Sequence, residues 1–432
     1  TLFRLGRMED FGARYERSAA RLSADPDLVL HHAAFLAGWG PPDRAAEGRE
    51  RLASAAQDPR QARLVARLRL AICRRALDAQ GYGDALDLLD QAGVARLEDR
   101  IAYWRLLRAV GRGSEARKLA AEYAYPLQTP GEVVQMADGL AALGMVDEAL
   151  VCLKHYVPQF GGSDSLWTRD MWVTYGSYLI ERKLWDELLH MAVQLRTAGR
   201  LGQEFEALSH FLEGRALRGL ERYEESQAAL QHAVARKFVD GPTALIVATD
   251  LVKLGMPDLA WAVLEPVENT LAAHPAYWQL RYEIAQALRR DASHLMHAAT
   301  QARSLAPTDS TTATKYLAAL LINRERPDEA TELSLRLLGA FPASPSVKVA
   351  RAAALAQNRR YPEAESFLEQ VESRELGETE SALFHLTGLE VAAALGHFEQ
   401  AQRHLQLIRT NLLFPSQVQW LESARASLPG AR

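Results

Sequence analysis

The sequence is poor in cysteine and has no long apolar run. The chain has two cysteines, Cys73 and Cys152, among 432 residues. They are too few for a disulfide framework in a chain of this length, and they do not form the closely spaced cysteine pairs of a zinc-binding motif. No apolar stretch approaches the roughly 18 residues that cross a bilayer. The net charge is −4, from 50 basic and 54 acidic residues. Such a balance argues against a general nucleic-acid or membrane-surface binder.

The motifs that carry common enzyme chemistry are also missing. The sequence contains no phosphate-binding loop, no dinucleotide-binding glycine pattern, no nucleophile elbow and no zinc-protease signature. His294 and His297 are three residues apart on an expected helix, but no acid or thiol stands at helical spacing to complete a metal site. We therefore expect neither a metal nor a cofactor, and no catalytic residue.

What the sequence does have is helical periodicity along nearly its whole length. Apolar residues recur at spacings of three and four, while alternating β-branched runs with tight turns are hard to find. Prolines fall mostly between the periodic segments, for example at Asp25-Pro26 and Thr129-Pro130, where a preceding helix has to end. The pattern predicts an all-α protein built from short helices.

These helices repeat. Shortly after a turn that contains glycine or an aromatic residue, a second helix carries a small or apolar marker residue. The markers, separated by 31 to 40 residues, are Phe11, Ala45, Ala85, Ala116, Ala149, Leu188, Ser226, Ala260, Leu295, Ala330, Ala364 and Ala401. A period near 34 with two helices per unit predicts a repeat array.

The pattern resembles the tetratricopeptide repeat (TPR) family. In most units a small residue of the first helix stands twelve positions before the marker, at Ala33, Cys73, Ala137, Gly176, Gly214, Ala248, Ala318 and Ala352. The resemblance implies a TPR-like α–α superhelix, a right-handed solenoid of helical hairpins whose first helices line the inner, concave surface. We expect residues 1–432 to form one continuous solenoid of about twelve units.

The two ends depart from the full hairpin. Residues 5–22 match a second helix without its partner, so residues 1–25 are expected to be a partial first unit. Residues 416–428 are expected to form a C-terminal capping helix, with Trp420 and Leu421 facing inward and Arg425 outward. Terminal helices of this kind keep repeat arrays from exposing an apolar end.

Basic residues are expected on the inner surface. Projection of the repeat pattern places there Arg67, Arg74, Arg105, Arg108, Arg215 and Arg218. Residues 1–125 carry 21 basic and 17 acidic residues, whereas residues 126–240 carry 11 and 16. Because guanidinium groups bind carboxylates in pairs of hydrogen bonds, such a stripe suits an acidic peptide. The alternative is an arginine-rich surface without a ligand, since only seven of the basic residues are lysine.

Later first helices are expected to be apolar. Tyr277, Leu280 and Ile284 recur at helical spacing and could form a patch that accepts a partner helix. The alternative is that the same side chains belong to the core between helices. The sequence leaves both open.

An open array of hairpins offers long rows of side chains and no single deep core for a catalytic centre. The function we expect is a non-catalytic scaffold that binds a protein or peptide in its groove, with an acidic partner as one candidate, and with no nucleic acid and no transmembrane segment. Two alternatives are a substrate-recruiting arm of an enzyme whose catalytic domain lies outside this chain, and a regulator that binds a peptide signal. The composition resembles that of bacterial TPR proteins, which implies a soluble protein of the bacterial cytoplasm or periplasm.

Overall fold

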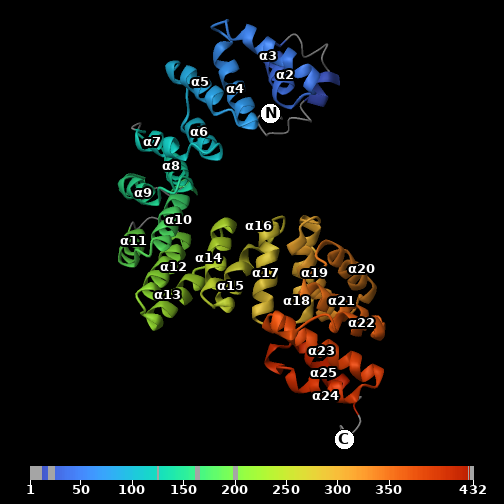
Figure 1. Cartoon of the computed structure of the whole chain (residues 1–432). Helices are drawn as coiled ribbons and strands as arrows, with labels where there is room; N and C mark the ends of the chain where they lie inside the picture. The colour runs from blue at the N-terminus through green and yellow to red at the C-terminus, as the bar shows by residue number, and fades with distance from the viewer. Residues whose placement is uncertain are drawn as a thin grey trace. The chain divides into compact units, whose positions relative to one another are not determined.

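A computed structural model describes residues 12–17, 25–123, 126–160, 166–197, 203–426 and 428. All regular structure within these ranges is helical, and no strand occurs in them. The expected all-α fold of helical hairpins is therefore confirmed. The chain divides into two compact units, with the division falling within helices α12 and α13 (Figure 1).

The first unit contains five consecutive hairpins, each made of two helices that pack against each other. They are α2 (Pro26–Trp39) with α3 (Pro42–Ala55), α4 (Ala62–Ala76) with α5 (Ala79–Gln91), α6 (Leu97–Ala109) with α7 (Gly113–Ala121), α8 (Pro130–Ala142) with α9 (Val146–Phe160), and α10 (Leu166–Glu181) with α11 (Trp185–Thr197). Helices α12 (Gln203–Gly219) and α13 (Tyr223–Ala235) follow.

The second unit continues the alternation to a final single helix. Its members are α14 (Gly241–Lys253), α15 (Pro257–Leu264), η1 (Glu265–Val267), α16 (Glu268–Leu271), α17 (Pro275–Ala287), α18 (Ala292–Leu305), α19 (Ser310–Asn323), α20 (Pro327–Ala340), α21 (Pro345–Gln357), α22 (Tyr361–Leu368), η2 (Ser373–Glu375), α23 (Glu378–Leu395), α24 (Phe398–Leu407), η3 (Thr410–Leu412) and α25 (Pro415–Ala426). None of the described helices is both long and apolar enough to cross a membrane.

One residue in left-handed conformation marks the turn inside each hairpin from α4 onward. These residues, 33 to 39 positions apart, are Leu77, Gly111, Gly144, Lys183, Glu221, Gly255, Arg289, Arg324, Arg359 and Gly396. A positive φ lets the chain leave the first helix and reverse within a few residues. The backbone thus repeats with the period that the sequence predicts.

Local sequence signals set where the helices begin. At α8, the Thr129 hydroxyl accepts from the Glu132 amide and the Glu132 carboxylate accepts from the Thr129 amide, at 3.2 and 3.1 Å. This reciprocal pair is a capping box. Prolines such as Pro26 and Pro130 occupy the first turn of the following helix, where no amide hydrogen is needed. The prolines expected between helices therefore open the next helix.

The predicted close contacts between paired helices are largely confirmed. Seven of the eight small residues are buried: Ala33, Cys73, Ala137, Gly176, Gly214, Ala248 and Ala352. The exception is Ala318, which is half-buried. Small side chains at these positions allow the two backbones of a hairpin to approach closely.

The ends of the chain differ in how far they test the predictions. Helix α25 begins at Pro415; Leu421 on it is buried, Trp420 is partly buried and Arg425 is exposed. A helix thus lies where the capping helix was expected, with Leu421 turned toward the interior. Of the partial unit expected over residues 1–25, only residues 12–17 and 25 are described, and residues 12–17 are helical. The rest of that prediction lies outside the described residues.

Replacing Leu77 with glycine is expected to stabilise the protein by about 0.5–1 kcal/mol. Leu77 has φ +55° and is 57% exposed, so glycine would relieve the left-handed penalty of a side chain and give up little burial. Leu88, on α5, is 50% exposed but lies within a helix. Leu88→Gly should therefore destabilise by about 1 kcal/mol. Urea titrations followed by circular dichroism would measure both, and equal signs would contradict the argument.

Candidate functional site

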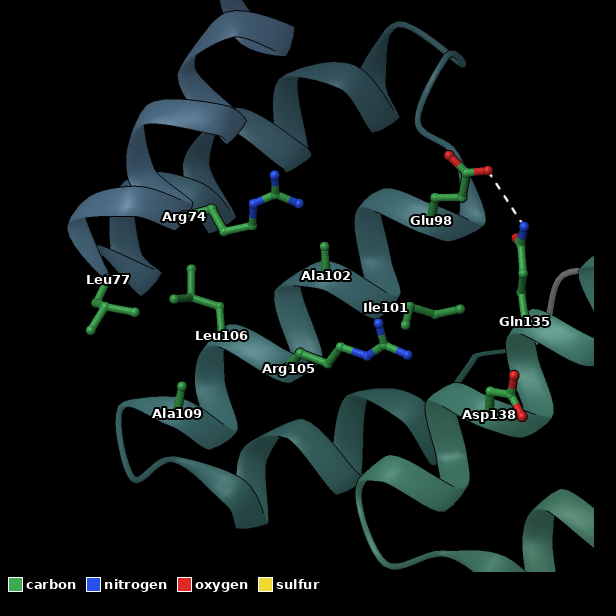
Figure 2. Close-up of a pocket in the computed structure, with 10 residues that line it drawn as sticks. All are labelled: Arg74, Leu77, Glu98, Ile101, Ala102, Arg105, Leu106, Ala109, Gln135 and Asp138. Carbon is green, nitrogen blue, oxygen red and sulfur yellow. Dashed lines mark hydrogen bonds between the residues drawn. The ribbon is translucent and has the colours of Figure 1, made fainter. Parts of the chain in front are cut away.

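The first helices of three consecutive hairpins, α4, α6 and α8, line an open cavity of about 470 Å³. We call this cavity the first-helix groove. Its lining, drawn in Figure 2, consists of Arg74, Leu77, Glu98, Ile101, Ala102, Arg105, Leu106, Ala109, Gln135 and Asp138. The surface that the repeat pattern assigns to binding is thus hollowed at this point.

Two arginines supply the positive charge of the groove. Arg74 stands near the end of α4 and Arg105 in the middle of α6, and both are exposed (Figure 2). Neither forms an ion pair with another described residue. Other arginines nearby are engaged, such as Arg100 with Asp90 and Arg112 with Glu115. Arg74 and Arg105 therefore keep their hydrogen-bond donors for a ligand.

Two carboxylates, on Glu98 and Asp138, supply the opposite charge, and both are hydrogen-bonded. The Gln135 amide donates to the Glu98 carboxylate at 3.5 Å, which joins α8 to the start of α6 (Figure 2). The hydroxyl of Tyr178, on α10, donates to Asp138 at 2.8 Å. Burial and this hydrogen bond raise the pKa of Tyr178, so its hydroxyl stays protonated. The groove is therefore cationic at Arg74 and Arg105 and anionic at Glu98 and Asp138.

Apolar side chains form the rest of the lining. Leu106 and Ile101 are 3% and 6% exposed, so they are largely fixed in the core. Leu77 instead holds its side chain in solvent, at 57% exposure, on the left-handed turn after α4. A partner lying in the groove would cover this leucine and gain the free energy of removing it from water.

The four arginines predicted on the first helices of this region have different environments in the structure. Arg74 and Arg105 line the groove, whereas Arg108 is exposed on α6 outside the lining. Arg67 pairs with Asp99 and also donates to the carbonyl oxygen of Val94. Arg67 therefore connects α4 to the start of α6 and does not line the groove, which differs from its expected place in the basic stripe.

Arg215 and Arg218 are also engaged within the protein. The guanidinium of Arg215 lies 5.9 Å from the Trp185 ring centre, and that of Arg218 lies 5.6 Å from the Tyr223 ring centre. Both arginines are half-buried. Their cation–π contacts within the first unit make them packing residues in this structure.

The predicted apolar patch is part of the core. Tyr277 and Ile284 are fully buried, and Leu280 is 7% exposed. The Tyr277 hydroxyl approaches the Glu268 carboxylate at 3.4 Å. These side chains present no surface to a partner helix. The expected docking patch is therefore wrong, and the alternative holds: the three residues belong to the core between the helices. Helical spacing alone does not distinguish an inward face from an accessible one.

The described residues do not support metal binding or a reactive thiol. His294 packs edge-on against Trp261 and His297 against Trp278, and no group of three metal-binding side chains gathers in the described part of the chain. Burial raises the pKa of both cysteine thiols, Cys73 and Cys152, to about 11. They are therefore protonated, unreactive thiols at neutral pH.

Sequence reasoning missed Leu77 and the polar side of the groove. A signal for the acids was present: Glu98 stands seven residues before Arg105, two turns earlier on the same helix face. Gln135 and Asp138 are likewise one turn apart on the next first helix. Placing all polar residues on the inner faces of the first helices, and not the arginines alone, would have found these groove residues.

A protein-family model matches part of the chain. The tetratricopeptide repeat family model matches residues 233–413. Comparison with curated protein sequences gives no match. Similar solved structures include the human IFIT1 dimer with m7Gppp-AAAA (12% identity, 88% of this chain and 95% of that chain, TM-score 0.30). A second is the pentatricopeptide repeat protein PPR10 from maize (16% identity, 94% of this chain and 67% of that chain, TM-score 0.32). A third is Naa15/Naa10 bound to HypK-THB (12% identity, 98% of this chain and 78% of that chain, TM-score 0.29). At these TM-scores the three likenesses carry no argument about function.

Proposed function

We propose, from the premise that this chain is a TPR-like repeat protein whose residues 233–413 match the tetratricopeptide family, that it is a non-catalytic scaffold. Its partner is a protein that inserts a peptide segment into the first-helix groove. Repeat arrays of this kind expose rows of side chains from successive helices and bind partners along them. The proposal extends to a single uninterrupted array, because the left-handed turns at Lys183, Glu221 and Gly255 keep their spacing where the two units divide.

The observation that carries this proposal is a pair of arginines that form no ion pair with any described residue. Arg74 and Arg105 line one cavity and are exposed, whereas Arg67, two turns before Arg74 on α4, is held by Asp99. Two guanidinium groups in one groove can each bind a carboxylate through two hydrogen bonds. An acidic peptide segment is therefore the partner that best suits this surface.

The same groove disfavours nucleic acid. Glu98 and Asp138 share the lining with the two arginines, and their carboxylates would repel a phosphate backbone. No aromatic side chain is among the lining residues to stack on a base. The chain as a whole is also slightly acidic, with a net charge of −4.

Replacing Arg74 and Arg105 together with alanine is expected to weaken acidic-peptide binding about tenfold or more. A phage-displayed random peptide library, selected on the immobilised chain, would supply the probes. Calorimetric titration of the selected peptides would then measure affinity at low and high salt. We expect acidic sequences to be enriched and their affinity to fall with salt, because exposed charges are screened.

Arg108→Ala provides the matched control, since Arg108 is exposed on α6 outside the lining. It should leave the affinity unchanged. The double variant should also unfold at the same temperature as the wild type, because exposed charges add little stability. Equal affinities for the wild type and the Arg74→Ala/Arg105→Ala variant would refute the proposed function.

A further inference from the structure

Three cavities lie in sequence around α6. The first-helix groove shares Glu98 and Gln135 with a second cavity of about 700 Å³ at the starts of α6 and α8. That cavity shares Asp90, Arg100 and Tyr123 with a third, of about 470 Å³, between α5, α6 and α7. Because neighbouring cavities share lining residues, they lie next to one another on the surface of the first unit, and we call this row of three cavities the path.

The length of α7 accounts for the third cavity. Helix α7 has 9 residues, whereas α5 and α9 have 13 and 15. The chain leaves the second-helix layer early, and Glu122 and Tyr123, directly after α7, line the opening beside α5. The path therefore leads from the first-helix face, past the start of α6, to the second-helix side.

The charge along this path changes sign. It begins at Arg74 and Arg105, passes Glu98, and reaches Asp87 and Glu122 in the third cavity. Asp87 is exposed and forms no ion pair with a described residue, while Glu122 forms a long, exposed ion pair with Lys118, at 3.9 Å. Both carboxylates are exposed, so a cation brought by a partner can reach Asp87 and compete with Lys118 for Glu122.

The middle of the path holds one more available charge. Arg100 pairs with Asp90 and lies 5.6 Å from the Tyr123 ring centre. Glu132 accepts from the amides of Gln128 and Thr129 at the start of α8. Arg96 lines the same cavity, is exposed and forms no ion pair with a described residue, so a second acidic residue of a ligand could bind there.

We propose that the partner is an extended polypeptide that follows all three cavities, with acidic residues at Arg74 and Arg105 and basic residues at Asp87 and Glu122. This rests on the proposed function and specifies its ligand. A helix, about 10–12 Å wide and straight, does not suit a path that turns around the start of α6. An extended chain, which advances about 3.3 Å per residue, can turn there and places charges of both signs.

The test uses fluorescent synthetic peptides and the full chain. One peptide has a glutamate block, an alanine–serine spacer and a lysine block, and a second peptide has the glutamate block and spacer alone. A third probe, an oligoadenylate RNA of similar length, tests for nucleic-acid binding. Fluorescence anisotropy measures their affinities for the wild type, for Asp87→Asn/Glu122→Gln, for Arg74→Ala/Arg105→Ala and for the Arg108→Ala control. Thermal unfolding confirms that each variant is folded.

We expect the two-block peptide to bind the wild type about tenfold more tightly than the glutamate-only peptide. Asp87→Asn/Glu122→Gln should abolish that difference and leave the glutamate-only peptide unaffected. If the difference persists in this variant, or never exists, the extended path is wrong while the first-helix groove still stands. If Arg74→Ala/Arg105→Ala changes neither peptide, or if only the RNA binds, the proposed function fails as well.

Discussion

Replacing Gly48 with alanine is expected to destabilise the first hairpin by about 2–3 kcal/mol. Gly48 lies on α3, where a Cβ atom would come within 2.5 Å of the Ala33 carbonyl oxygen and 2.6 Å of the Ala37 amide nitrogen on α2. Both are backbone atoms, so they cannot move aside as the end of a side chain could. The two helices would have to separate, and the contact between them would be lost.

A second glycine makes the measurement internally controlled. Gly339 lies in α20, and a Cβ atom built on it would meet nothing within 4 Å. Gly339→Ala should stabilise the protein by about 0.5–1 kcal/mol through helix propensity alone. Urea denaturation gives both changes, and hydrogen exchange in α2 and α3 localises the first. A Gly48→Ala variant with unchanged stability would mean that α2 and α3 are farther apart than described.

Acidification from pH 6.5 to 4 is expected to lower the free energy of unfolding by about 3 kcal/mol through His404 alone. Burial, together with the neighbouring His385, lowers the pKa of His404 to about 4. Burial lowers the pKa of His385 as well. In the unfolded chain histidine takes up a proton near pH 6.5. The unfolded state therefore binds more protons over this range, and stability is lost as the pH falls.

The geometry explains why protonation is unfavourable there. The Nδ1 atoms of His385, on α23, and His404, on α24, are 3.1 Å apart. One nitrogen can donate to the other only while the acceptor ring is neutral. The ring of Phe384 packs edge-on to both imidazoles, and the His404 ring fills the space beside Gly388, where a Cβ atom would lie 2.5 Å from it. Neither ring has room to turn away.

His404→Asn would test this, since asparagine can place a polar atom near Nδ1 but does not titrate. Urea titrations of this variant at several pH values between about 7.5 and 4.5, a range that spans the pKa of an ordinary histidine, should show a shallower loss of stability than in the wild type. His274→Asn, at an exposed position, is the control. His32 is also buried with a lowered pKa, so the difference between variants is the measured quantity. Parallel pH profiles for wild type and His404→Asn would refute the argument.

The fold was largely predictable because its determinants are local. The markers Ala116 and Ala149 each lie five residues after a left-handed glycine, Gly111 and Gly144. A left-handed turn and a small contact residue recur in most units, and a proline starts several of the helices, so most hairpins can be located from their own residues. The division into two units has no such local signal and was not expected.

The candidate site was predictable only in part, because it depends on which side chains meet. The pattern correctly placed Arg74 and Arg105 on first helices, but it could not tell that Asp99, from a different helix, would engage Arg67. Tyr277 and Ile284 have the spacing of an exposed stripe and yet are fully buried. The spacing of residues shows which of them share one face of a helix. Whether that face is accessible to a partner depends on which other helices pack against it.

The contact between the last helix and α19 bears on how the array unfolds. The Ser416 hydroxyl donates to the carbonyl oxygen of Ile322, 94 residues earlier, and Arg324 lies 3.8 Å from the Trp420 ring centre and pairs with Glu390 on α23. In an array held together only by neighbouring repeats, hairpins can fray one at a time from an end. Here the terminal helix also contacts a hairpin three positions back, so its detachment breaks contacts with α19 as well as with its neighbours. We therefore expect α25 to resist fraying more than a helix held by one neighbour, and its contacts with α19, which span 94 residues, to form after the local hairpins.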